Sequence, residues 1–92
     1  MTEQRRVVVT GLGVVSPVGS TLDSFWAAIQ AGESGIGPIT YFDATAFDTK
    51  FAGQVKGFNI EEFVPKKEAR RMDPFCHYGV AAAKMAVADS GL

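Results

Sequence analysis

The feature that most constrains this chain is residues 6–19, RVVVTGLGVVSPVG, a run of β-branched residues that breaks into glycines and then a proline. Successive β-branched residues suit a strand covered on both faces, so we expect a buried strand over Arg6–Thr10, in a sheet flanked by helices. Gly11 and Gly13 permit backbone conformations closed to other residues. Pro17 forces the residue before it toward extended geometry, so no helix can run through this stretch.

The first helix is expected to begin near Thr21, with Ser20 as its N-cap, and to stop at Gly32. Residues at helical spacing give it one apolar face, formed by Leu22, Phe25, Trp26 and Ile29. A loop with Gly35, Gly37 and Pro38 is expected to follow the helix.

The middle of the chain has weaker signals. Residues 40–50 look irregular, with Phe42 and Phe47 as anchors, and residues 51–58 resemble an edge strand weakened by Gly53 and Gly57. A short helix is expected over Lys66 to Met72, opened by Pro65.

The last helix is expected from Pro74 to about Ser90, with Asp73 as N-cap and Gly91 as its stop. Apolar side chains cover most directions around it, and only His77 and Lys84 form a thin polar stripe. Such a helix belongs inside a larger structure, and a chain of 92 residues can scarcely surround it.

Composition sets the broad class of the protein. The chain is 47% hydrophobic with a net charge of -1, so nothing favours nucleic acid or an anionic membrane as a partner. One cysteine excludes an internal disulfide, and no signal peptide or membrane-spanning stretch is visible. A cytoplasmic protein with one small domain's length of chain is therefore expected.

Gly11 and Gly13 after a strand invite a dinucleotide-binding interpretation. That fingerprint requires a third glycine at position 16 and a helix whose N-terminus meets the pyrophosphate. Position 16 is Ser16, Pro17 follows, and the helix is delayed to about residue 21. We therefore favour a structural role, in which the glycines let the backbone pack closely against another element.

Cys76 and His77 look like a nucleophile beside its base. Adjacent helical residues point about 100° apart, so these two side chains do not face each other. Free cysteine is among the most buried residue types, which favours core packing for Cys76, and His77 is expected at a helix surface or interface. A lone Cys and His cannot supply the four ligands of a structural zinc site.

Four cations stand within six residues, offset locally by Glu68; they are Lys66, Lys67, Arg70 and Arg71. On a helix, the last three of them would share a face. Taken alone the cluster suits a solvated surface, and its functional alternative is a docking patch for an acidic protein or a phosphate group.

The motifs resemble a known family when they are taken together. RRVVVTGLGVVSPVG, FWAAIQAGESGI, KFAGQVKGFN and KKEARRMDPFCHYGVAAAKMAVADSGL stand in the order and spacing of the N-terminus of β-ketoacyl-acyl-carrier-protein synthases, above all the synthase II type of bacterial fatty-acid elongation. The likeness runs over residues 1–92, which would form the incomplete N-terminal portion of one such domain.

The resemblance implies a thiolase-like α/β fold, an αβαβα sandwich of two similar halves, each with a mixed five-stranded sheet, in an enzyme that is usually a homodimer. It implies decarboxylative Claisen condensation of a cysteine-bound acyl group with malonyl-carrier protein. No metal or resident cofactor is implied, because the phosphopantetheine arm arrives on the acyl carrier protein.

The resemblance also assigns site residues. The family's nucleophilic cysteine and its two histidines map beyond Leu92, so no catalytic residue is assigned here, and neither Cys76 nor His77 takes those roles. Family members dock their acidic carrier protein partly through basic residues at the start of this helical region. The matching positions are Lys67, Arg70 and Arg71, with Lys66 beside them.

Three alternatives stay open at this point. A non-condensing partner subunit, similar to a chain-length factor, would share this N-terminus and lack the cysteine. The ketosynthase part of a polyketide synthase would share it too. A stand-alone interaction domain is disfavoured, because too little chain is left to cover the apolar helix.

Overall fold

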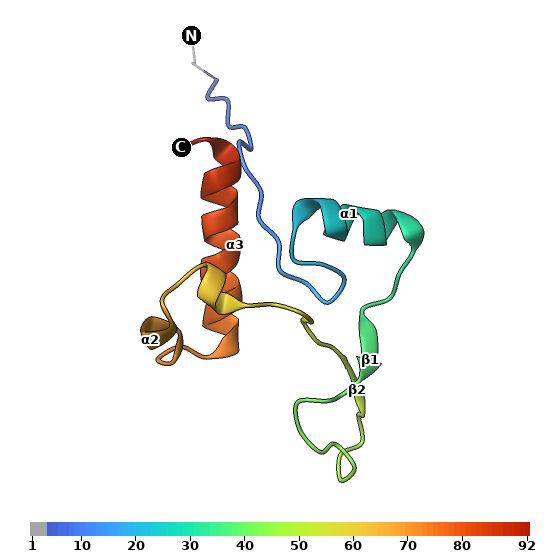
Figure 1. Cartoon of the computed structure of the whole chain (residues 1–92). Coiled ribbons are helices and arrows are strands. Elements are labelled where there is room, and N and C mark those ends of the chain that lie inside the picture. The colour runs from blue at the N-terminus through green and yellow to red at the C-terminus, as the bar shows by residue number, and fades with distance from the viewer. Residues whose placement is uncertain (1–3) are drawn as a thin grey trace.

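The computed structural model describes residues 4–92, and its elements run in the order helix, strand, strand, short 3-10 helix, short helix, long helix. Their bounds are α1 Leu22–Ala31, β1 Ile36–Pro38, β2 Phe51–Gly53, η1 Ile60–Glu62, α2 Lys66–Ala69 and α3 Pro74–Ser90. In Figure 1 the N-terminal segment runs alongside α3, while α1 and the β1–β2 pair extend to the other side of that segment.

The described part of the chain is extended. Its radius of gyration is 17.1 Å and its principal extents are 63 × 37 × 26 Å, whereas a compact domain of this length has a radius of about 12 Å. No large side chain is fully buried among residues 4–92, and the buried positions are Ala28, Ala44, Val64, Ala69 and Ala81. Residues 4–92 therefore form no core of large apolar side chains by themselves.

The buried strand expected over Arg6–Thr10 does not form in this structure. Val7, Val8 and Val9 are 93%, 70% and 78% exposed, and the segment has no strand assignment. The reason is that a central strand needs neighbours, and the one sheet within residues 4–92 is the β1–β2 pair.

Helix α1 begins one residue later than expected, because its N-cap is Thr21 and not Ser20. Thr21 and Ser24 cap each other reciprocally, with Ser24 N donating to Thr21 Oγ1 at 3.1 Å and Thr21 N to Ser24 Oγ at 3.2 Å. The helix ends at Gly32 as expected, where φ is 71°. Its apolar face is largely uncovered, since Trp26 is 59% exposed.

The strand signals were only partly correct. β2 stops at Gly53 instead of running to residue 58, and it pairs antiparallel with β1, which lies where only a loop was expected. Residues 40–50 are irregular, as expected, and Phe42 and Phe47 pack edge to face with ring centres 5.6 Å apart. Both rings are more than half exposed, so they do not serve as buried anchors.

Helix α3 has the expected bounds, Pro74–Ser90, and Gly91 ends it with φ of 77°. Asp73 occupies the N-cap position, although its side chain makes no capping hydrogen bond. The burial expected for this helix is found at Ala81, which is 0% exposed, whereas Phe75 is 72% and Val87 53% exposed. Within residues 4–92, α3 is thus covered on part of its circumference only.

Candidate functional site

Gly11 and Gly13 lie directly against the C-terminal half of α3. A Cβ on Gly11 would overlap the carbonyl oxygen of Ala86, and a Cβ on Gly13 would overlap the carbonyl oxygen of Ala82. Between the two glycines, Leu12 N donates a hydrogen bond to Asp89 Oδ2 at 2.9 Å. The predicted structural role of the two glycines is therefore confirmed, and α3 is the element against which they pack.

The same geometry leaves no room for a dinucleotide at these glycines. Their backbone faces helix carbonyls, which repel phosphate, and α1 begins only at Leu22, after a turn closed by paired hydrogen bonds between Ser16 and Gly19. The Ser16 side chain also donates to Gly19 O at 2.7 Å. These bonds fix a turn over residues 16–19, and this turn accounts for the late start of α1.

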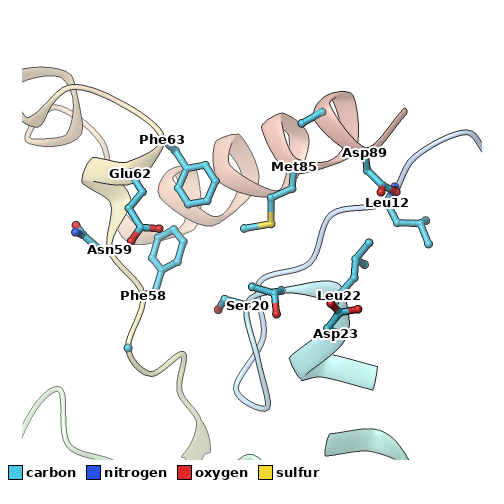
Figure 2. A pocket seen from close by; sticks show the side chains of 13 residues that line it. Leu12, Ser20, Leu22, Asp23, Phe58, Asn59, Glu62, Phe63, Met85 and Asp89 are labelled. Carbon is cyan, nitrogen blue, oxygen red and sulfur yellow. The ribbon is translucent and has the colours of Figure 1, made fainter. Parts of the chain in front are cut away.

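A cavity of about 600 Å³ lies between the start of α1, η1 and the C-terminal half of α3. Figure 2 shows the thioether of Met85 pointing into the space between Phe58 and Leu22. Its lining carries the carboxyl groups of Asp23, Glu62 and Asp89 and no lysine or arginine, so it does not suit an anionic ligand. It is a gap between packed elements with an acidic rim.

Aromatic contacts join the segment before η1 to α3. Phe58 stacks on Phe63 with ring centres 5.9 Å apart and meets Tyr78 edge to face at 5.4 Å. Burial raises the pKa of the Tyr78 phenol above its ordinary value of 10.0, and hydrogen bonding and charge interaction with Tyr41 raise it further. Tyr78 is therefore neutral at physiological pH and acts in packing.

Cys76 and His77 do not form a catalytic pair in the described structure. Cys76 is a free, half-buried thiol, and the hydrogen bond of His77 joins its Nε2 to the carbonyl oxygen of Ala69 at 2.8 Å. His77 thus lies between α3 and the end of α2, an interface within the chain. Among residues 4–92 no group of three or more potential ligands is arranged to hold a metal ion.

The four cations predicted as a docking patch lie on α2 and the turn after it, and we call residues 66–71 the cationic segment. All four side chains are exposed, whereas Ala69 in their midst is buried. The helix is shorter than expected: it ends at Ala69, and Arg71 N and Met72 N bond to carbonyls three residues back. Arg70 and Arg71 therefore lie beyond the helix, and they do not share a helical face with Lys67 as predicted.

The polar stripe of α3 makes two hydrogen bonds that the sequence pattern did not predict. His77 bonds to the carbonyl of Ala69 in the cationic segment, and Lys84 Nζ donates to the carbonyl of Phe63, which precedes that segment, so the stripe faces residues 63–69. The signal was present, because polar side chains seven residues apart on an otherwise apolar helix usually have polar partners. Which carbonyls they reach could not be inferred from spacing.

The family model "Beta-ketoacyl synthase, N-terminal domain" matches residues 4–92. The chain belongs to the β-ketoacyl synthase family. This confirms the resemblance drawn from the motifs.

Two curated relatives of the chain are named "3-oxoacyl-[acyl-carrier-protein] synthase 2". The protein of Vibrio cholerae is 57% identical over 97% of this chain and 22% of its own length. The protein of a Synechocystis species is 49% identical over 98% of this chain and 22% of its own length. The chain thus spans about a fifth of the relatives that it matches.

A solved structure shares the fold of this chain. The structure described as "The ishigamide ketosynthase/chain length factor" matches with a TM-score of 0.85 and 41% sequence identity, covering 98% of this chain and 22% of the other. The extended arrangement of residues 4–92 is therefore that of a ketosynthase N-terminal region, which implies a thiolase-like fold. No helix among these residues is long and apolar enough to cross a membrane.

Proposed function

We propose that this chain is the N-terminal portion, residues 1–92, of a 3-oxoacyl-[acyl-carrier-protein] synthase of fatty-acid biosynthesis. The observation that carries the proposal is the 57% identity to a synthase 2 over nearly the whole chain. The complete protein would be a cytoplasmic homodimer with the αβαβα sandwich of the thiolase fold. In that sandwich the exposed Val7–Val9 run would gain strand neighbours, and the uncovered faces of α3 would be buried.

The proposed reaction is an acyltransfer followed by a decarboxylative condensation. The acyl group passes from the carrier thioester to a cysteine thiolate, which releases the carrier thiol. Malonyl-carrier protein then loses CO2, and the resulting carbanion attacks the acyl-enzyme carbonyl. The new carbon–carbon bond gives 3-oxoacyl-carrier protein and frees the cysteine. We assign none of these catalytic groups to residues 1–92, and we propose no resident cofactor or metal.

The part that we assign to this chain is recognition of the acidic carrier protein through Lys66, Lys67, Arg70 and Arg71. Four of the nine lysine and arginine residues lie in this segment of a chain whose net charge is -1, so the positive charge is local. Exposed cations of this kind steer an acidic partner and increase the association rate at low salt.

Activity is tested by assaying the full-length protein with acyl- and malonyl-carrier protein for CO2 release and 3-oxoacyl product. Docking is tested with the double variant Arg70→Glu and Arg71→Glu. We expect about a tenfold weaker carrier affinity at low ionic strength, with the difference shrinking as salt is added. Affinity equal to the unmodified protein at every salt concentration would refute the docking role, and absence of product would refute the condensing role.

A non-condensing partner subunit is the second candidate, favoured by the likeness to a ketosynthase/chain length factor structure. The two candidates differ at the nucleophile of the complete protein. Trapping of a radiolabelled acyl group on a cysteine supports the condensing enzyme, whereas carrier binding without acylation supports the partner subunit.

A further inference from the structure

We infer that His77 is a positioning residue, which holds the cationic segment against α3 in the geometry that meets the carrier protein. The inference rests on the proposed docking function and adds to it a residue that carries no part of the docking charge. His77 belongs to α3, and the segment that it holds belongs to α2 and the following turn.

The Ala69 carbonyl is the point at which the segment is held. It accepts two hydrogen bonds, from His77 Nε2 at 2.8 Å and from Met72 N at 3.2 Å. Ala69 is 7% exposed, so the bonds are made where water competes little. This carbonyl lies in sequence between Lys67 and Arg70, and a shift of Ala69 would therefore move cations on both sides.

The segment has little means of holding itself. α2 has four residues and no side-chain cap, and a single helical turn is unstable without tertiary contacts. A second α3 side chain supports the other end, because Lys84 Nζ donates to the carbonyl of Phe63 beside buried Val64. The two side chains of the polar stripe thus hold the two ends of residues 63–69.

The chemistry of the contact defines which replacements keep it. A carbonyl only accepts, so His77 must carry its proton on Nε2, and a glutamine amide can donate in its place. Phenylalanine fills the ring volume and donates nothing. Holding the segment in place reduces the ordering cost of binding, so we expect loss of this donor to raise the KM for carrier-bound substrate about threefold.

The test compares His77→Phe, His77→Gln and Ser90→Ala in the full-length enzyme. Ser90→Ala removes a hydrogen bond to Val87 O at the far end of the same helix and serves as the matched control. KM and kcat are measured with malonyl-carrier protein and with a small malonyl thioester, and amide hydrogen exchange is followed over residues 69–72.

We expect His77→Phe to raise the carrier KM alone, with kcat and the small-thioester KM unchanged, and to speed exchange over residues 69–72. His77→Gln should restore most of both, and Ser90→Ala should alter neither. Unchanged carrier KM in His77→Phe, while the double variant Arg70→Glu and Arg71→Glu raises it, overturns the positioning role alone. Unchanged carrier KM in both variants overturns the docking proposal together with this inference.

Discussion

Two faces of α3 hold their neighbours by different means. On one face, the backbone of Gly11 and Gly13 lies against the carbonyls of Ala82 and Ala86, with no space for a side chain. On the polar stripe, which points to a different side of the helix, the side chains of His77 and Lys84 reach across to the carbonyls of residues 69 and 63, and the cations nearby stay exposed.

The difference indicates where this chain tolerates substitutions. At a contact between two backbones, an added side-chain atom forces the main chain to move, so such a contact is suited to fixing the position of the N-terminal segment. A contact made by long side chains can shift without moving the helix, so it is suited to holding a segment that must meet a partner. Substitutions at the first contact should affect stability, and those at the second should affect binding.

The largest expected effect is that of Gly13→Ala. The added methyl group would overlap Ala82 O, and we expect the free energy of unfolding of the full-length protein to fall by about 3 kcal/mol. Denaturant unfolding measures it. Gly37→Ala, where nothing lies within 4 Å of the new carbon, is the control, and an equal loss in both variants would show that the contact with α3 is not the cause.

A smaller loss is expected from Asp89→Ala, which removes the acceptor of the Leu12 N–H. One charge-assisted hydrogen bond at an exposed site contributes up to about 1 kcal/mol, so the same unfolding measurement should show a loss no larger than that. Since the cationic segment is not involved, carrier affinity should stay the same. A drop in carrier affinity without a loss of stability would contradict the division of roles between these two faces of α3.

The smallest effect is expected from Gly79→Ala on α3. Within residues 4–92 nothing lies within 4 Å of an added carbon, and the lower entropy of the unfolded chain favours the helix by about 0.5–1 kcal/mol. The proposed covering of this face in the complete protein opposes that gain, so we expect the melting temperature of the full-length protein to change little. A gain of the full size would show that this face of α3 stays uncovered, against the proposed sandwich.

Local signals predicted the bounds of α1 and α3 well, whereas α2 was predicted to run to Met72 and ends at Ala69. Asp73-Pro74 and Gly91 define α3 because caps and stops depend on neighbouring residues, and Gly32 ends α1 for the same reason. The N-cap of α1 was misplaced by one residue, since Ser20 and Thr21 are both capping residues and only the reciprocal bond with Ser24 decides between them.

Contacts between distant residues could not be predicted in the same way. The pairing of β1 with β2 joins Ile36 to Gly53 across an irregular loop, and no local pattern marks the partner. The Gly11–Gly13 motif predicted a close approach but not the helix that it meets. In the candidate site, the cluster of four cations can be read directly from the sequence. The carbonyl partners of His77 and Lys84 could not be predicted, because they depend on how α3 packs against residues 63–69.

The most direct test of the account is amide hydrogen exchange of the full-length protein with and without the acidic carrier protein. We expect carrier binding to slow exchange over residues 66–72 and to leave residues 11–13, which lie against a different face of α3, unchanged. The slowing should weaken in high salt, because the docking contact is electrostatic. Unchanged exchange over residues 66–72 at saturating carrier concentration would contradict the assignment of the docking surface to this chain.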